Sequence, residues 1–372
     1  MSSRAVKVVE ELLAEADVRI NGDRPWDLRV HDERLYDRIL AAGSLAVGES
    51  YMDGWWEVEQ LDRFFEKVLT ARLEQRIRRG LHVVLHMLRV SLINPQSRWR
   101  SYQVGKRHYD TGNELFERML DRRLTYSCGY WKETENLDHA QEAKLDLICR
   151  KLGLKPGMRL LDIGCGWGSL VKYAAETYGV EAVGVTVSRQ QAEYARQQCA
   201  NLPVRIEYQD YRKLDEPFDR IASVGMFEHV GRKNYPTFMQ VAYRCLKPGG
   251  LFLLHTIGSN YSTYGTDPWI EKYIFPNSML PSLSQLSKAA EYKFITEDVH
   301  CFGPYYDTTL MAWERNFCNA WNDLKLIYDD RFYRMWRFYL LSSAASFRTR
   351  RIQLWQVLLG KQSRPASVVR LS

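Results

Sequence analysis

The feature that most constrains the fold is an alternation of apolar segments of strand length with amphipathic segments of helix length, which begins at Arg159. The letters RLLDIGCG predict a buried strand, and GSLVKYAAETYG predict the helix that follows it. Further predicted strands are EAVGVTVS, VRIEYQD, FDRIASVG and GLFLLHTIG, with helices at RQQAEYARQQCA and YPTFMQVAYRCL. Apolar strands that alternate with helices are typical of a parallel sheet covered on both faces. We therefore predict a doubly wound α/β fold.

The chain before and after this alternating region has a different pattern. Residues 1–92 predict a small, mostly helical N-terminal domain, with one long helix from Leu61 to Leu88. The polar residues 93–105 contain Asn94-Pro95 and are interpreted as a linker. Residues 106–372 then form the second domain. Near its end, EYKFITEDVHCFG predicts a strand, residues 307–345 predict two helices, and RIQLWQVLLGK predicts a last strand.

Composition excludes some classes of protein. The chain has 372 residues, 45% of them hydrophobic, and a formal net charge of +7, which argues against intrinsic disorder and favours an anionic partner. Its seven cysteines are odd in number and form no C-x-x-C pair, which argues against a disulfide framework and a zinc site, and for a reducing compartment. The first residues predict an amphipathic helix and not a signal peptide. Without a run of about 18 apolar residues, we expect a cytoplasmic protein whose membrane contact is peripheral.

A glycine-rich turn follows the first strand of the alternating region. Asp162 precedes three glycines with G-x-G-x-G spacing, Gly164, Gly166 and Gly168. Glycines at such a turn let the backbone approach a ligand closely. A dinucleotide fingerprint has G-x-G-x-x-G spacing and binds a pyrophosphate. S-adenosylmethionine has an ammonium, a carboxylate and a sulfonium but no phosphate, so an acidic residue at the turn suits it.

The ends of the next two strands supply further candidate cofactor contacts. Ribose sites of this architecture often have an acid after the second strand. This chain has Thr186 there, so we expect hydroxyl and amide groups, Thr186 and Gln191, to contact the ribose. After the third strand, Asp210 is predicted to accept from the adenine amino group, with Tyr211 stacked on the ring. Each of these could equally be an ordinary loop residue.

Several long motifs, in order, resemble cyclopropane-fatty-acyl-phospholipid synthases. They are YSCGYW, LDIGCGWG, GVTVS, GMFEHVG, LLHTIGS, DPWIEKYIFPN and YYDTTLMAW. The resemblance extends to GSLAVGESYMDGWWEVEQLDRFF, which is typical of the bacterial two-domain enzymes, whereas mycolic-acid methyltransferases resemble only the catalytic part. It implies a class I S-adenosylmethionine-dependent methyltransferase fold with helical lid insertions and an antiparallel strand inserted near the end of the sheet. It also implies a homodimer.

The resemblance further implies that a bicarbonate ion lies in the active site. The residues that would hold it are Cys128, Glu228, His255, the backbone amide of Ile257, and Tyr306. Tyr126 and Ser127 would contact S-adenosylmethionine. Some relatives carry a cysteine near the C-terminus that was suspected of catalysis. Ser343 stands at that place here, which rules out a nucleophilic cysteine there.

The implied reaction adds a methylene to the cis double bond of an unsaturated phospholipid acyl chain. An alkene is a weak nucleophile, so it must be held against the sulfonium methyl in a dry, aligned pocket. Aromatic faces can stabilise the resulting carbocation, and a base must then remove a proton so that the ring closes. Asp162, Thr186, Asp210, Glu228 and His255 all fall at the carboxyl ends of predicted strands, where open α/β sheets bind ligands.

Other functions remain open at this stage. A lipid methyltransferase could leave a methyl branch or a methylene, because these products share the carbocation. The basic charge suits a nucleic-acid methyltransferase, but the sequence shows no RNA-binding module and no N-P-P-Y motif. A non-enzymatic lipid-binding or scaffold protein is the third alternative.

Membrane docking is assigned to basic residues in the predicted long helix or in the C-terminal tail. The first group is Arg72, Arg76, Arg78, Arg79 and Arg89. The second group is Arg348, Arg350, Arg351, Lys361, Arg364 and Arg370. The alternative for the helix is packing on its own domain or on a partner subunit.

Overall fold

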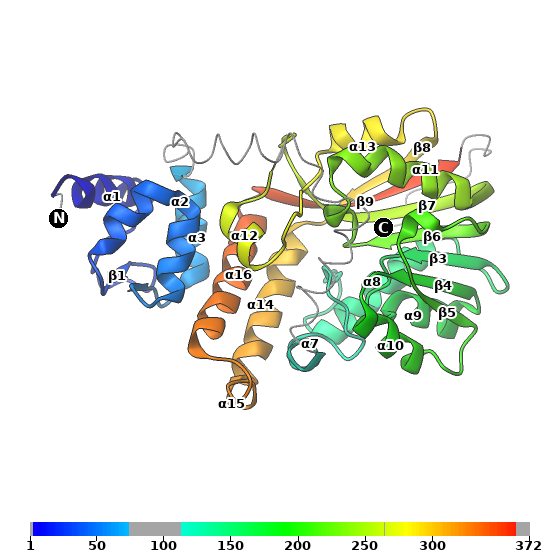
Figure 1. The fold of residues 1–372 in the computed structure, drawn as a ribbon, viewed down its shortest axis with the longest axis horizontal. Coiled ribbons are helices and arrows are strands. Elements are labelled where there is room, and N and C mark those ends of the chain that lie inside the picture. The colour runs from blue at the N-terminus through cyan, green and yellow to red at the C-terminus, as the bar shows by residue number, and fades with distance from the viewer. Residues whose placement is uncertain (1–2, 74–112, 264, 362–372) are drawn as a thin grey trace. The chain divides into compact units, whose positions relative to one another are not determined.

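The computed structural model describes residues 3–73, 113–263 and 265–361 of the chain (Figure 1). The protein forms two compact units, each assembled from segments that are far apart in the sequence. The first unit comprises the described residues of Met1–Ile93, Tyr264–Pro276 and Leu310–Ile352. The second unit comprises those of Asn94–Thr263, Asn277–Thr309 and Gln353–Ser372. Each unit therefore depends on early and late parts of the chain.

A seven-stranded sheet forms the centre of the second unit, with the spatial order β5-β4-β3-β6-β7-β9-β8. Its strands are β3 (Arg159–Ile163), β4 (Glu181–Thr186), β5 (Val204–Tyr208), β6 (Phe218–Val224), β7 (Leu246–Ser259), β8 (Phe294–Cys301) and β9 (Ile352–Lys361). The pairs from β5 to β7 are parallel, whereas β8 and β9 are antiparallel. The predicted fold is confirmed, including a last strand inserted between two earlier ones. The chain changes direction across the sheet between β3 and β6, which is where open α/β sheets bind ligands.

Helices cover both faces of this sheet (Figure 1). One hydrophobic layer joins the sheet to α8 (Leu137–Leu152), α9 (Ser169–Tyr178) and α10 (Arg189–Gln198). The other joins it to α11 (Tyr235–Cys245) and α13 (Leu283–Ala290). Shorter helices at the carboxyl edge are α7 (Asn113–Met119), η1 (Tyr211–Lys213), η2 (Phe227–His229) and η3 (Arg232–Asn234). Because both faces are covered, the central strands β3 and β4 are buried along most of their length, whereas β5 and β8 at the two edges are partly exposed.

The first unit is mainly helical. Its elements are α1 (Ser3–Glu15), β1 (Arg29–Val30), α2 (Arg34–Met52), β2 (Trp56–Glu57), α3 (Leu61–Thr70), α12 (Pro268–Tyr273), α15 (Trp321–Leu324) and α16 (Asp330–Arg348), together with the end of α14 (Pro304–Asn319). Phe338 of α16 joins the three segments. Its ring lies 5.6 Å from Tyr51, 5.0 Å from Phe65 and 4.5 Å from Trp269. Aromatic pairs at such distances add to the energy of burial, which accounts for the unit's discontinuous composition.

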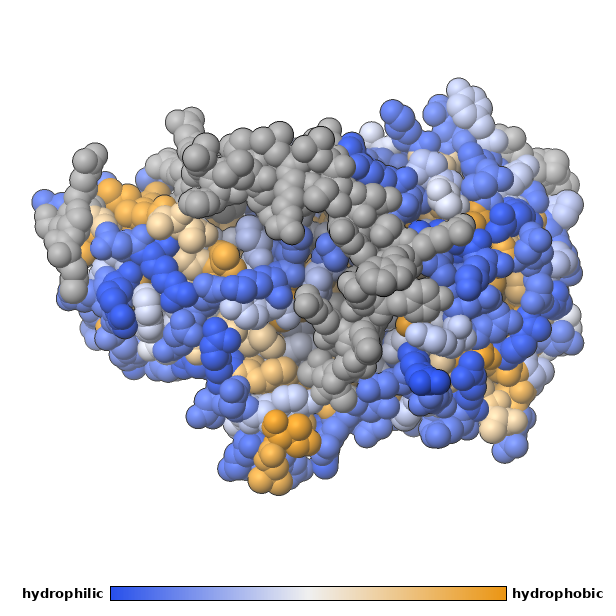
Figure 2. All heavy atoms as spheres, in the orientation of Figure 1, coloured by the Kyte–Doolittle hydropathy of each residue, from blue (hydrophilic) through white to orange (hydrophobic). Residues whose placement is uncertain are grey.

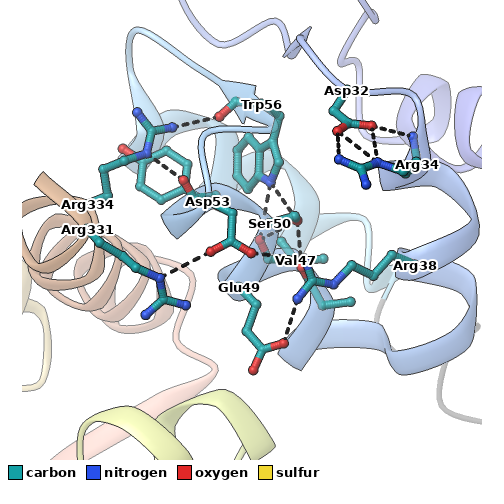
Figure 3. A network of polar contacts seen from close by, with 12 residues as sticks. Asp32, Arg34, Arg38, Val47, Glu49, Ser50, Asp53, Trp56, Arg331 and Arg334 are labelled. Atoms are coloured by element: carbon teal, nitrogen blue, oxygen red, sulfur yellow. Dashed lines mark hydrogen bonds and ion pairs between the residues drawn. The ribbon is translucent and has the colours of Figure 1, made fainter.

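Polar contacts reinforce the same unit, as Figure 3 shows. Arg334 of α16 donates to the carbonyl oxygens of Tyr51 and Trp56 and pairs with Glu57 at 2.7 Å. Arg331 pairs with Asp53 at 3.2 Å. Arg334 thus bonds a carbonyl group at the end of α2, where intrahelical partners run out.

One part of the predicted helical pattern is wrong. The apolar spacing predicted one helix from Leu61 to Leu88, but α3 ends at Thr70. Arg72 has a φ of 57°, a left-handed conformation that a right-handed helix does not accommodate. Residues 74–112, and with them the predicted linker, Arg76, Arg78, Arg79 and Arg89, lie outside the described residues.

The predicted domain boundaries, 1–92 for the N-terminal domain and 106–372 for the catalytic domain, stay a prediction. The compact units add a feature that the sequence did not indicate. We predicted residues 259–292 and 307–345 as the helical lid insertions. Tyr264–Pro276 and Leu310–Ile352, which overlap these segments, group with the N-terminal residues. The aromatic and arginine contacts of α16 described above are the physical reason.

The surface is mostly hydrophilic, with isolated apolar patches (Figure 2). One of these lies at the turn after α15, where the side chains of Leu326 and Ile327 are 84% and 55% exposed. Of the helices in residues 3–73, 113–263 and 265–361, none is long and apolar enough to cross a bilayer.

Candidate active site

The glycine-rich turn connects β3 to α9 as predicted. Gly164, Gly166 and Gly168 have φ values of 90°, 56° and 88°, which favour glycine over residues with a side chain. A Cβ on Gly164 would lie 2.5 Å from Cγ of Met226. The amides of Gly164 and Cys165 donate to the carbonyl oxygen of Val185, which holds the turn against β4. The turn therefore needs glycine for both conformation and space.

Asp162 lies at the end of β3, between Gly184 of β4 and Ala222 of β6. Its side chain is buried, and its Oδ1 has no hydrogen-bond partner within the described part of the chain. Burial raises the pKa of this carboxyl to about 7, and the positive charge of Lys144 opposes the rise. A buried acceptor without a donor is unfavourable. The position therefore suits a ligand that brings a cationic donor.

Lys144 of α8 is a buried cation that sequence reasoning missed. Its Nζ donates to Oγ of Ser127 at 2.9 Å. Burial lowers the pKa of Lys144 to about 8, and the carboxyl groups of Asp121 and Asp162 oppose that shift through their charges. The sequence did carry a signal, because Lys144 precedes the apolar Ile148 by one helical turn, on the face that packs against the sheet.

The loop before α8 holds Tyr126, Ser127 and Cys128 in place. Asp121 accepts a hydrogen bond of 2.7 Å from the amide of Thr125. Gln141 of α8 donates to the carbonyl oxygen of Ser127 at 2.7 Å. Ser127 is thus bound through its carbonyl to Gln141 and through its hydroxyl to Lys144. The ring of Tyr126 packs edge-on against Phe116 at 5.2 Å.

Thr309 attaches the other end of this loop to α14. Its Oγ1 accepts from the amide of Gly129 at 3.0 Å and from Nε1 of Trp131 at 2.8 Å. It donates to the carbonyl oxygen of Tyr305 at 2.8 Å. Tyr306 lies beside this contact in the first turn of α14 and is 8% exposed. Thr309, which the sequence analysis did not single out, therefore links the loop that carries Cys128 to the helix that carries Tyr306.

Cys128 is fully buried. Its Sγ donates to the carbonyl oxygen of Gly129 at 3.2 Å and lies 3.9 Å from Oγ1 of Thr309. Burial raises the pKa of the Cys128 thiol well above its usual range. The sulfur is therefore a thiol at neutral pH, which suits hydrogen bonding and not nucleophilic attack.

The candidate ribose contacts are next to each other. The hydroxyl of Thr186 donates to Oε1 of Gln191 at 3.0 Å and accepts from the amide of Ser188 at 3.2 Å. Ser188 caps α10, where its hydroxyl accepts from the amide of Gln191. The structure therefore brings Thr186 and Gln191 together at the end of β4, and their contact with a ribose stays a prediction.

The candidate adenine contacts are engaged within the protein. The carboxylate of Asp210 accepts from the backbone amide of Arg212 at 2.9 Å and from its guanidinium at 2.8 Å. The ring of Tyr211 packs edge-on against Phe238 at 5.3 Å in the hydrophobic core. A role of either residue toward adenine stays a prediction.

Glu228 lies in η2, just after β6, and is buried. Its Oε1 accepts a hydrogen bond of 2.7 Å from the amide of Ile257, whereas Oε2 has no partner among the described residues. Burial raises the pKa of Glu228 to about 7, and hydrogen bonds from the backbone of Glu228 itself and of Ile257 oppose the rise. The structure therefore brings two predicted site residues into contact and leaves one carboxyl oxygen for a ligand.

His255 of β7 is two residues before Ile257 and is 1% exposed. Its Nδ1 lies 3.2 Å from Nε2 of Gln356, and its Nε2 has no partner in the described ranges of the chain. Its ring packs edge-on against Phe302 at 5.7 Å. Burial lowers the pKa of His255 well below its usual value, with Lys144 and Lys151 acting in the same direction. The imidazole is therefore neutral at physiological pH.

Aromatic rings surround His255 and the Cys128 loop. Phe302 also packs edge-on against Tyr130 at 5.5 Å, and Tyr130 packs against Tyr305 at the same distance. Phe302 was not among the predicted site residues. These rings form an aromatic cluster beside His255, and a role of the cluster toward a carbocation stays a prediction.

The sheet order, the glycine turn and the residues at the carboxyl edge define an S-adenosylmethionine-dependent methyltransferase. The chain belongs to the family described as mycolic acid cyclopropane synthetase, whose model matches residues 96–357.

Comparisons with individual proteins agree with this membership. The chain is 53% identical to the cyclopropane-fatty-acyl-phospholipid synthase of Escherichia coli strain K12, over 95% of this chain and 93% of that protein. It resembles the structure of the cyclopropane synthase MmaA2 of Mycobacterium tuberculosis with a TM-score of 0.66 and 32% identity, over 70% of this chain and 98% of that one. Coclaurine N-methyltransferase, with a TM-score of 0.71 and 21% identity over 85% of this chain and 99% of that one, shares the fold.

Proposed function

We propose that this protein transfers a one-carbon unit from S-adenosylmethionine to the cis double bond of an unsaturated phospholipid acyl chain and closes a cyclopropane ring. The observation that carries the proposal is the similarity to the E. coli synthase over 95% of the chain. The geometry supports it, because the buried carboxyl of Glu228 accepts from the amide of Ile257, two residues after the neutral imidazole of His255, which lies beside a cluster of aromatic rings.

The residues at the turn fit S-adenosylmethionine. Asp162 has a buried oxygen without a donor, and the ammonium group of this molecule would provide one. Gly166 leaves the backbone open to close approach, because a Cβ there would meet nothing within 4 Å in the described part of the chain. Ser127 is held by its contacts with α8, and Tyr126 packs against Phe116. When bound, the cofactor supplies the electrophilic methyl group that the alkene attacks.

The remaining steps need a proton acceptor and a dry site. After methyl transfer the acyl chain carries a positive charge, which the faces of Phe302 and Tyr130 can stabilise. A methyl proton must then leave so that the ring can close. Glu228, whose pKa burial raises to about 7, is able to take up a proton when ionised, whereas His255, whose pKa is lowered well below its usual value, stays neutral. Their burial excludes water, which would otherwise trap the cation.

Bicarbonate remains part of the proposal, and the side chains fit such an anion in part. An N–H at Nε2 of His255 is a possible donor. The Cys128 thiol donates to the carbonyl oxygen of Gly129 and would have to turn away from it to reach an anion. The amide of Ile257 already donates to Glu228, so an anion would have to share this donor. Tyr306 would complete the set from α14. The protein's part is to hold the anion and to take up, through an ionised Glu228, the proton that the anion receives.

The proposed activity is tested by incubating the protein with S-adenosylmethionine and vesicles of unsaturated phospholipid. Fatty-acid analysis should show a gain of one CH₂, and proton nuclear magnetic resonance should show ring protons. A methylene product has the same mass but vinyl protons, and a methyl branch has neither signal. Either result would support the alternative function, a lipid methyltransferase that leaves a methylene or a methyl branch. No gain in mass, with intact cofactor binding, would favour the scaffold alternative, and transfer to RNA or DNA would favour a nucleic-acid methyltransferase.

We also propose peripheral contact with the inner face of the cell membrane, because the substrate lies in the bilayer. Arg72 is exposed, whereas Arg348 pairs with Asp62 at 2.9 Å and Lys361 donates to the carbonyl oxygen of Tyr243 at 3.0 Å. Of the C-terminal basic group, Arg364 and Arg370 lie outside the described residues. The observations therefore support Arg72 more than Arg348 or Lys361. The homodimer remains a proposal that rests on the family resemblance.

A further inference from the structure

The buried residue that contacts the proposed active-site histidine is Gln356 of β9. Strands β7 and β9 are neighbours in the sheet. Along β7, Leu251 and Leu253 face α8, and by alternation His255 continues that face. On β9, Leu358 faces the same layer, and Gln356 lies two residues before it. His255 and Gln356 therefore form a polar pair at the end of an otherwise apolar layer.

The hydrogen bond within this pair is directional. Nε2 of Gln356 lies 3.2 Å from Nδ1 of His255, and both side chains are at most 1% exposed. An amide NH₂ can only donate, so Nδ1 must offer its lone pair. In a neutral imidazole the proton then resides on Nε2. This nitrogen has no partner in the described part of the protein, so its N–H is available to a bound molecule.

We propose that Gln356 is a positioning residue that fixes His255 as the Nε2–H tautomer, so that the imidazole donates a hydrogen bond to an oxyanion bound in the active site. The identity of that oxyanion rests on the proposed function, whereas the tautomer does not. A glutamine suits this role because it directs the imidazole without adding charge. A carboxylate at the same place would accept from Nδ1–H and reverse the tautomer.

Among the groups around His255, the side-chain amide of Gln356 is the contact that determines the tautomer. Phe302 packs edge-on against the imidazole, and Lys144 and Lys151 act on it only through their charges. The positive charges disfavour the imidazolium and so keep the ring neutral. Only a neutral imidazole has two alternative tautomers. Oε1 of Gln356 has no partner in the ranges that the structure describes. If the amide were turned round, Oε1 would instead accept from Nδ1–H, so the two arrangements predict opposite tautomers.

Nitrogen-15 spectra of the full-length protein labelled at histidine distinguish these arrangements directly. The signals of His255 are assigned by their loss in His255→Gln. We expect Nε2 to show the shift of a protonated ring nitrogen and Nδ1 that of an unprotonated one. The opposite pattern, or an even mixture of tautomers, would overturn the proposal. This measurement needs neither turnover nor a variant of Gln356, so it stands even if the protein makes no cyclopropane.

Variants of Gln356 then connect the tautomer to function. Gln356→Glu should reverse the tautomer and lower kcat by at least about tenfold, with KM for S-adenosylmethionine within about twofold, because the donor to the oxyanion is lost. Gln356→Leu should leave a mixture of tautomers and an intermediate kcat. The matched control is Gln353→Glu, on the same strand but on the other face, which should leave the spectrum of His255 unchanged.

The variants distinguish a positioning role for Gln356 from a merely structural one. A merely structural role for Gln356 would lower thermal stability in both variants without a change of tautomer, and the proposal would then be wrong. A reversed tautomer with unchanged kcat would also contradict it, because His255 would not need its Nε2 proton. If no variant or wild-type protein forms product, only the proposed function fails.

Discussion

Nζ of Lys144 donates a hydrogen bond of 2.9 Å to Oγ of Ser127, although the lysine is only 1% exposed. The charge is balanced by two buried carboxyl groups, Asp121 and Asp162, which act on Lys144 in the direction that keeps it protonated. Asp121 shapes the loop that carries Ser127, and Asp162 ends the strand before the glycine turn. One buried cation thus couples the loop and the turn that are proposed to bind the cofactor.

Lys144→Met is expected to weaken binding of S-adenosylhomocysteine by at least about tenfold and to lower the free energy of unfolding by about 3 kcal/mol, because it leaves buried carboxyl groups uncompensated. Titration calorimetry and urea unfolding measure the two effects. The matched control is Lys155→Met, because Lys155 is exposed.

Adding Asp121→Asn to Lys144→Met should recover part of the stability, since it removes one uncompensated carboxylate. Unchanged binding in the single variant would show that Lys144 supports the fold alone.

Glu228→Gln is expected to lower turnover by at least about tenfold while cofactor affinity changes by less than about twofold. The amide can still accept from the amide of Ile257 but cannot take up a proton. Initial rates on lipid vesicles and calorimetric cofactor titration provide the comparison. Glu135→Gln, at an exposed glutamate, is the control. Loss of cofactor binding with an intact fold would place Glu228 in the cofactor site instead.

The stability of the protein should depend on the charge state of Glu228. Its pKa is raised from 4.5 to about 7 by burial, so the folded state holds a proton that the unfolded state releases first. The favourable contribution is complete below pH 4.5 and is lost as the pH rises through about 7.

A shift of this size corresponds to about 3 kcal/mol as an upper estimate. Urea unfolding across this pH range should show a shallower decline in Glu228→Gln than in the wild type. The residual slope should come in part from Asp162, whose pKa burial also raises to about 7. Equal slopes in the two proteins would mean that Glu228 is ionised in the folded state.

Membrane docking by the basic residues that follow α3 is tested by changing Arg72, Arg76 and Arg79 together to Gln. Binding to anionic vesicles and activity on them should fall, whereas activity on detergent-dispersed substrate should change much less. Salt should weaken the wild-type binding, because exposed charges are screened over about 8–10 Å at ordinary ionic strength.

A triple change of Arg122, Arg150 and Arg189, whose side chains are 60%, 44% and 80% exposed, removes the same charge elsewhere and is the control. If both triple variants bind vesicles as the wild type does, docking must lie elsewhere. The exposed Leu326 and Ile327 would then be the next residues to change.

The sequence by itself determined the sheet and the glycine turn, because both are written in local patterns. The strands β3, β4 and β6 contain short apolar runs, and the spacing of Gly164, Gly166 and Gly168 specifies a turn within a few residues. The prediction from apolar spacing was wrong where the backbone conformation interrupts the helix. The helix predicted from Leu61 to Leu88 ends at Thr70, just before the left-handed Arg72.

Only the tertiary structure decided how distant residues act on one another. His255 and Gln356 are 101 residues apart, and their contact depends on the insertion of β9 next to β7. The sequence places Lys144 on a helix, but only the structure shows that it is buried and that the charges of two carboxyl groups act on it. The physical reason is that burial and pairing change the energy of a charge by more than any neighbour in sequence does, and both are properties of the packed fold.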